Sequence, residues 1–199
     1  MVNLQFDCHL GEVWANVHKD IKEILYTEEE IAERVKEIGN ALTDKYSKLV
    51  DAGEKVVLVS VLRGAAIFMA DLARATEVTM EMDYMAVSSY GSGVKSSGEV
   101  KIINDLTSTI EGKHVVVVED ILDSGLTLQY LLGVFEKRKP ASVEVVTLLR
   151  KRTRQQAPIE CAHIGFECPD EFIVGYGLDY AERYRNLPYI GILKPEVYS

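Results

Sequence analysis

The stretch HVVVVEDILDSGLT, residues 114–127, contains the two signals that decide the fold of this chain. His114 to Glu119 is a β-branched run, which predicts a strand buried on both faces of a sheet. Leu126 to Lys139 predicts a helix that ends at Pro140, because proline cannot continue a helix. A buried strand followed at once by a helix is the repeating unit of α/β folds, so we expect this class.

Similar apolar runs flank this stretch. Val56 to Leu62 and Val143 to Leu149 predict two further buried strands, and Met80 to Val87 predicts a less apolar one. The alternation of such strands with helices predicts a parallel sheet with helices on both faces. Ligands of such folds bind beyond the carboxyl ends of the strands. We therefore expect the chemistry in the loops that follow Leu62, Val87, Val118 and Leu149.

Two helices are predicted before the central stretch. Thr27 and Glu30 have the spacing of a capping box, which predicts a helix from about Glu28 toward Tyr46. Ala65 to Ala75 predicts a second helix. The apolar residues that recur at helical spacing in the first of them are Ile31, Val35, Ile38 and Leu42.

Carboxylates and hydroxyls crowd the junction between the central strand and its helix. Glu119, Asp120 and Asp123 precede Ser124-Gly125-Leu126-Thr127. The start of a helix, with a glycine and two hydroxyls, suits a phosphate, whereas carboxylates suit ribose hydroxyls, Mg²⁺ or a proton to be removed. The segment is therefore a candidate site for a sugar phosphate and a metal. The alternative is that Asp123 or Ser124 only caps the helix.

Length and charge limit the remaining possibilities. The 199 residues suit one domain, or one domain with a small appendage. A net charge of −9 argues against broad nucleic-acid binding, since phosphate contacts need clustered Lys and Arg. No apolar run approaches the roughly 20 residues that span a bilayer, and Met1 to Leu10 lacks a signal-peptide pattern. The expected location is the cytoplasm, which also suits an odd number of cysteines.

The segment Ser88 to Gly98 (SSYGSGVKSSG) has the composition of a long mobile loop, because Ser and Gly fill most of it. Tyr90 is its only aromatic residue. A lid needs an apolar group with which to cover a reacting centre, so we expect Ser89 and Tyr90 to close over the site. The alternative is a surface loop that only joins two strands.

The segment VVVVEDILDSGLT resembles the phosphoribosyl-pyrophosphate (PRPP) signature of the type I phosphoribosyltransferases. Further motifs resemble the hypoxanthine-guanine branch of that family, and they follow in family order between about Ile24 and Leu193. They are Leu62-Arg63-Gly64 (pyrophosphate loop), Ser89-Tyr90-Gly91 (lid), Lys151-Arg152-Thr153 (purine reading), Phe172 to Tyr180 (base-stacking hood) and Arg185 (pyrophosphate contact).

This resemblance implies the type I phosphoribosyltransferase fold, with a central parallel sheet flanked by helices and a small hood formed by the C-terminal segment. It implies one domain over residues 24–199, preceded by an extension of unknown role over residues 1–23. Two positions depart from the family pattern. Leu126 stands where relatives often have a polar or basic residue, and Arg63 stands where they often have Lys. Arg binds pyrophosphate well through its planar fork.

The resemblance also assigns roles to the matching residues. Asp123 would be the general base or proton relay at purine N7, and Glu119 and Asp120 would hold the ribose hydroxyls and Mg²⁺. Asp179 would contact a second Mg²⁺. The phosphate cradle would be Asp123, Ser124, Gly125, Leu126 and Thr127. Pyrophosphate would bind Arg63 and Gly64, across a strained or cis peptide bond, and Arg185. The purine would meet Lys151 at O6, Phe172 on its ring, and the backbone of Ile173 and Asp179 at its C2 edge.

The reaction implied by the resemblance joins hypoxanthine or guanine to PRPP with Mg²⁺ and releases pyrophosphate, and the family usually forms dimers or tetramers. One alternative is a phosphoribosyltransferase for xanthine or another base. A second is a regulatory protein of the same fold that senses PRPP and binds nucleic acid. The acidic balance disfavours a DNA-binding regulator, which would carry a basic face.

Overall fold

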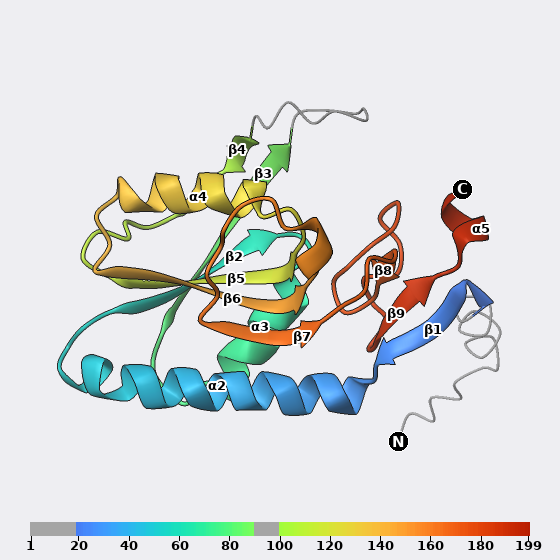
Figure 1. Ribbon diagram of the computed structural model, residues 1–199. Helices are drawn as coiled ribbons and strands as arrows, with labels where there is room; N and C mark the ends of the chain where they lie inside the picture. Colours follow the sequence, from blue (N-terminus) through green and yellow to red (C-terminus); the bar gives the residue numbers. More distant parts are fainter. Residues whose placement is uncertain (1–18, 90–99) are drawn as a thin grey trace, which may run out of the picture.

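The computed structural model describes residues 19–89 and 100–199, which form a larger and a smaller sheet (Figure 1). The smaller sheet lies at the end toward which the parallel strands of the larger one point. The elements are β1 (Ile21–Tyr26), α2 (Glu28–Asp51), β2 (Val56–Leu62), α3 (Ala66–Ala75), β3 (Glu81–Ser89), β4 (Val100–Asn104), β5 (His114–Leu122), α4 (Leu126–Glu136), β6 (Ser142–Arg150), the 3₁₀ turn η1 (Arg152–Arg154), β7 (His163–Glu167), β8 (Ile173–Val174), β9 (Ile190–Leu193) and α5 (Pro195–Tyr198).

The larger sheet has the strand order β4-β3-β2-β5-β6-β7. Neighbouring strands from β3 to β7 run parallel, whereas β4 pairs antiparallel with β3 at the edge. The predicted parallel α/β sheet is therefore confirmed, with one antiparallel edge strand that the apolar pattern did not indicate. The exposed Ile103 and Asn104 of β4 explain this, since an edge strand with one covered face lacks a continuous apolar run.

Helices cover both faces of the larger sheet, as Figure 1 shows for α4 on one side and α2 with α3 on the other. Successive residues of β5 alternate between the two cores because side chains along a strand point to opposite faces. Val115 and Val117 belong to the core under α4, whereas Val116 and Val118 belong to the core under α2 and α3. All four side chains are inaccessible to solvent, which confirms the strand buried on both faces.

The helix α2 begins with the predicted capping box. Thr27 Oγ1 accepts a hydrogen bond from the Glu30 backbone N–H, and the Glu30 carboxylate accepts one from Thr27 N. The helix continues beyond the predicted end, to Asp51. In contrast, α4 ends at Glu136 rather than at Lys139, because the chain tightens into turns that place Lys139 at φ 54°.

The smaller sheet, called the hood here, has the strand order β1-β9-β8 and consists of antiparallel pairs. Its own core contains Val174, Tyr184, Leu187, Tyr189 and Leu193. The C-terminal segment supplies β8 and β9 of the hood, as predicted, and β1 adds one edge strand. The predicted domain boundary between residues 23 and 24 falls inside this strand. The local sequence does not indicate that β1 pairs with β9, because β9 lies near the other end of the chain.

The predicted loop Ser88 to Gly98 begins later than its composition indicates. Both Ser88 and Ser89 belong to β3, where their backbones pair with Lys101 and Val100 of β4. The prediction of a loop at these two serines is therefore wrong, since backbone pairing outweighs their side-chain preferences. The remainder of the segment, including Tyr90 and its expected role in a lid, lies outside the described residues.

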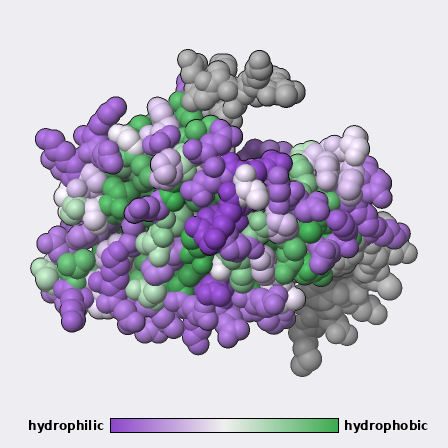
Figure 2. Space-filling model, in the orientation of Figure 1, coloured by the Kyte–Doolittle hydropathy of each residue, from purple (hydrophilic) through white to green (hydrophobic). Residues whose placement is uncertain are grey.

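Hydrophilic residues predominate on the face shown in Figure 2, and apolar residues appear in patches between them. Among the helices of the described ranges, none is long and apolar enough to cross a membrane.

Candidate active site

The acidic turn lies at the carboxyl end of β5, in the middle of the larger sheet. The strand extends beyond its predicted end at Glu119 to Leu122, which pairs with Arg150 of β6, so Asp120 also lies within the strand. The cap of α4 is Gly125, with φ 77°, and it makes no side-chain capping hydrogen bond. The alternative in which Asp123 or Ser124 caps the helix is therefore wrong. Ser124 Oγ makes only a 3.4 Å contact with Leu126 N.

A small cavity of about 100 Å³ lies against this turn, and the start of α4 borders it. Gly125 adopts the left-handed conformation that favours glycine, and an added Cβ would lie 3.1 Å from Ile159. Free backbone N–H groups at the start of the helix attract an anion, so this cavity suits a phosphate. Its lining residues are Glu119, Ile121, Leu122, Asp123, Ser124, Gly125, Thr127 and Leu128.

Two consecutive carboxylates, Glu119 and Asp120, lie at this turn, and Glu119 lines the cavity. Removal from solvent raises the pKa of Glu119 well above its usual value, and the charge of Asp120 raises it further. Removal from solvent also raises the pKa of Asp120, to about 6, although the Ile121 N–H and Arg185 lower it. An added Cβ on Gly64 would lie 1.7 Å from Asp120 Oδ2, so a side chain there would displace the Asp120 carboxylate. The Asp120 carboxylate therefore lies directly against the loop that follows β2.

Glu119 and Asp120 have the carboxylate chemistry that a magnesium ion shared with a substrate requires. In the described part of the chain, no group of three or more His, Cys, Asp or Glu side chains is placed to hold a metal ion alone. Magnesium, however, usually binds through one or two carboxylates together with phosphate oxygens of a substrate. Because both pKa values are raised, a cation beside Glu119 and Asp120 would stabilise their charged forms.

Two arginines converge beside the loop after β2, where the peptide bond between Leu62 and Arg63 is cis. Arg63 Nη2 lies 2.6 Å from Glu182 Oε1, and Arg185 Nη2 lies 2.7 Å from Asp179 Oδ1 and 3.6 Å from Glu182 Oε2. Glu182 thus contacts both cations, and their fork-shaped side chains suit a pyrophosphate.

A cavity of about 400 Å³ lies between the acidic turn and the hood. Lys151 is only 7% exposed there, and its Nζ donates a hydrogen bond of 2.8 Å to the Glu171 carbonyl. Asp123 Oδ1 is buried and has no hydrogen-bond partner in the described ranges, while Asp123 Oδ2 lies 4.0 Å from Arg154. The lining residues are Ile121, Asp123, Lys151, Arg154, Asp170, Glu171, Phe172, Ile173, Leu178, Asp179 and Tyr198.

Tyr198 is a member of this cavity that the sequence patterns did not indicate. Its ring stacks on Phe172, with centroids 4.9 Å apart and planes inclined by 26°. Tyr180 meets the same Phe172 ring edge-on at 5.4 Å. A tyrosine in the last turn of the chain carries no local signal of function, so only the folded hood reveals the contact.

The structure brings most of the predicted site residues together at one end of the larger sheet. The five predicted residues Asp123, Lys151, Phe172, Ile173 and Asp179 line the 400 Å³ cavity, and the acidic turn joins it to the small cavity. Gly64 lies beside Asp120, Arg185 pairs with Asp179, and Arg63 meets Arg185 at their shared partner Glu182. Ser89 is placed only as part of β3, and Tyr90 is outside the described residues. The structure adds six residues to the lining of the 400 Å³ cavity: Ile121, Arg154, Asp170, Glu171, Leu178 and Tyr198.

Residues 28–181 match a family model described as the phosphoribosyl transferase domain. The chain is 53% identical over 180 residues to the hypoxanthine-guanine phosphoribosyltransferase of Bacillus subtilis, covering 90% of this chain and 97% of that protein. It is also 53% identical over 184 residues to the bifunctional protein TilS/HprT of Listeria monocytogenes. That match covers 92% of this chain but only 28% of the Listeria protein.

Solved structures agree with the sequence comparison. A crystal structure of a hypoxanthine phosphoribosyltransferase from Staphylococcus aureus matches with a TM-score of 0.87 and 50% sequence identity, over 92% of this chain and 97% of that chain. The family match includes the acidic turn, Lys151 and Phe172, whereas Arg185 and Tyr198 lie beyond it. The chain therefore belongs to the phosphoribosyl transferase family and, within it, to the hypoxanthine-guanine phosphoribosyltransferases.

Proposed function

We propose that the chain transfers the 5-phosphoribosyl group of PRPP to N9 of hypoxanthine or guanine, giving the nucleoside 5′-monophosphate and pyrophosphate. The observation that supports this most is the position of Asp123. It belongs both to the small cavity at the start of α4 and to the cavity that holds Lys151 and Phe172. A phosphate in the first and a base in the second would place the ribose between them, over Glu119 and Asp120.

Base recognition in this proposal depends on Lys151. Lys151 lines the cavity, and its ammonium has three N–H donors, of which the hydrogen bond to the Glu171 carbonyl uses one. A purine O6 can accept one of the others. Phe172 offers its ring to the base, and the backbone near Ile173 and Asp179 would meet the C2 edge.

The proton that the purine loses would pass to Asp123. Its Oδ1 is a buried acceptor without a partner in the described ranges, a costly arrangement unless a ligand donates to it. A protonated purine nitrogen is such a donor. As N9 attacks C1′, the Asp123 carboxylate would take up a proton at N7 and hold it during the transfer.

The opposite side of the ribose would hold the departing pyrophosphate. Arg63 and Arg185 would donate to its oxygens, replacing Glu182 and Asp179 as their partners. A Mg²⁺ held by Glu119 and Asp120, and a second Mg²⁺ beside Asp179, would supply positive charge to the same oxygens. The two arginines thereby stabilise the charge that develops on the leaving group.

Turnover of free bases tests the proposal. Purified chain is incubated with PRPP and Mg²⁺ and with hypoxanthine, guanine, xanthine, adenine or a pyrimidine, and the nucleotide formed is measured. Use of hypoxanthine or guanine at the highest kcat/KM supports the proposal, whereas preference for xanthine or a pyrimidine supports the alternative substrates. Absence of turnover with every base, together with retained PRPP binding, would favour the regulatory alternative.

The family resemblance supports a homodimer or homotetramer that works in the cytoplasm on small molecules, without a membrane or nucleic-acid partner. Sedimentation analysis measures the oligomeric state. The same resemblance supports residues 1–23 as an extension, although β1 links Ile21 to the hood.

Tyr198 provides a prediction for the base end of the site. Replacing it with Ala removes the ring stacked on Phe172, and aromatic pairs contribute about 0.5–1.5 kcal/mol. We expect the KM for hypoxanthine to rise about 2- to 10-fold, with the KM for PRPP unchanged. Steady-state kinetics with Tyr198→Phe as the matched control, which keeps the stack, measures the effect. A fall in the KM for hypoxanthine in Tyr198→Ala would mean instead that the ring competes with the base.

A further inference from the structure

We propose that Tyr176 and Asp71 form a positioning pair, which holds the pyrophosphate end of the site in place from outside it. Neither residue belongs to the cavities described above. The inference rests on the proposed function, because it assigns Arg63, Gly64 and Arg185 to pyrophosphate.

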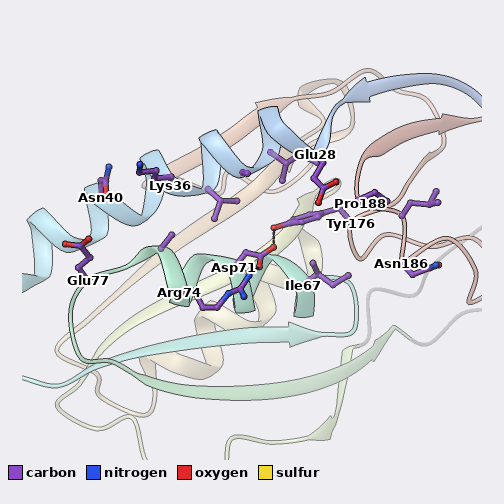
Figure 3. Close-up of a pocket in the computed structure, with 15 residues that line it drawn as sticks. Glu28, Lys36, Asn40, Ile67, Asp71, Arg74, Glu77, Tyr176, Asn186 and Pro188 are labelled. Atoms are coloured by element: carbon purple, nitrogen blue, oxygen red, sulfur yellow. Dashed lines mark hydrogen bonds and ion pairs between the residues drawn. The ribbon is translucent and has the colours of Figure 1, made fainter. Parts of the chain in front are cut away.

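The pair joins the hood to α3. Tyr176 Oη donates a hydrogen bond of 2.6 Å to Asp71 Oδ2, which Figure 3 shows as the contact between the hood turn and the helix. The other oxygen of Asp71 accepts from Arg74 at 2.6 Å. The Tyr176 ring is only 7% exposed and forms part of a cavity of about 800 Å³ between α2, α3 and the hood. The hydroxyl therefore has a partly buried charged partner.

The helix α3 starts at Ala66, immediately after the pyrophosphate loop. The Ala66 N–H donates to the Arg63 carbonyl at 3.2 Å, so the first turn of the helix holds the loop directly. Asp71 lies in the second turn of this helix. Whatever fixes Asp71 relative to the hood thereby also fixes the loop relative to the hood.

The turn that carries Tyr176 touches the same loop from the other side. Gly175, Tyr176 and Gly177 have φ values of 100°, 48° and 102°, so three successive residues are left-handed. An added Cβ on Gly177 would lie 2.0 Å from the Gly64 carbonyl oxygen, which shows how closely the two backbones pack. A bulky residue in this conformation is uncommon, and here it directs the phenol toward α3.

Gly177 also positions Arg185. Its carbonyl accepts from Arg185 Nη1 at 2.7 Å, and its N–H donates to the Arg185 carbonyl at 2.9 Å. One residue after Tyr176, the turn thus contacts both the pyrophosphate loop and the arginine that faces it. A shift of the turn would move Arg185 and release Gly64, whereas Lys151 and Phe172, which line the 400 Å³ cavity, are not part of the turn.

The test uses Tyr176→Phe, which keeps the buried ring and removes only the hydroxyl. We expect the Kd for Mg-pyrophosphate and the KM for PRPP to rise about 3- to 10-fold, which is less than a directly lost charged hydrogen bond would cause. The KM for hypoxanthine should stay within about twofold, a change too small to reflect a lost contact. Asp71→Asn, which retains an oxygen acceptor, should remain close to the wild type.

Tyr46→Phe is the matched control, because Tyr46 also donates to a carboxylate, Glu144, at 2.7 Å from a buried ring. That contact joins α2 to β6, and its loss should lower thermal stability without changing the KM for PRPP or the KM for hypoxanthine. The inference would be overturned if Tyr176→Phe and Tyr46→Phe had the same KM for PRPP and the same Kd for Mg-pyrophosphate. It would also be overturned if the KM for PRPP and the KM for hypoxanthine rose equally in Tyr176→Phe. Calorimetric titration of pyrophosphate needs no turnover, so failure of the proposed function would appear separately, in the wild-type assay.

Discussion

Replacing Asp123 with Asn is expected to lower the rate of phosphoribosyl transfer by about 100-fold or more, with PRPP binding largely kept. The amide has nearly the same shape as the carboxylate but cannot accept the purine proton. Asp123 Oδ1 is buried and has no hydrogen-bond partner in the described ranges, so it is free to meet a donor on the base. The loss falls on the chemical step because a general base acts mainly in the transition state.

Single-turnover measurement of nucleotide formation separates this step from product release. Asp170→Asn is the matched control, since Asp170 lines the same cavity but its carboxylate is already paired with Arg154. A far smaller loss is expected there. Transfer at nearly the wild-type rate by Asp123→Asn would remove this carboxylate from the mechanism and leave the proton to another acceptor.

The second large effect concerns Lys151 and the choice of base. We expect Lys151→Ala to lower kcat/KM for hypoxanthine and guanine about 10- to 100-fold, because hydrogen bonds to charged groups contribute about 1.5–3 kcal/mol. The wild type should discriminate against adenine at least as strongly. The adenine amino group is a donor, so the ammonium would face another donor in a largely buried place.

Competition between hypoxanthine and adenine for limiting PRPP measures this discrimination directly. Lys22→Ala is a suitable control, because the Lys22 ammonium pairs with the Glu171 side chain while Lys151 uses the Glu171 carbonyl. It should leave the preference unchanged. Efficient use of adenine by the wild type would exclude this role for Lys151, even if the alanine variant were also impaired.

Much of the fold follows from local chemistry. The four valines of β5 had to be buried on both sides, which requires layers of helix on each face, and the structure contains them. The capping box at Thr27 is equally local, since its two hydrogen bonds join residues one helical turn apart. Element ends were less predictable. Glu119 and Asp120 remain in β5 because β6 supplies backbone partners as far as Arg150, a neighbour that the strand itself does not reveal.

The order of polar residues along the chain indicated the kind of site, because phosphate, ribose and base each require particular side chains. The sequence alone therefore determined the α/β class, the acidic turn and the residue types available at the ends of the strands. Contacts between distant segments depended on the tertiary structure. Three contacts form only when the chain folds: the pairing of β1 with β9, the stacking of Tyr198 on Phe172 and the hydrogen bond from Tyr176 to Asp71. Each of these contacts joins residues more than a hundred positions apart or depends on how two side chains are oriented in space. Composition and periodicity describe only neighbouring residues, so they cannot predict such contacts.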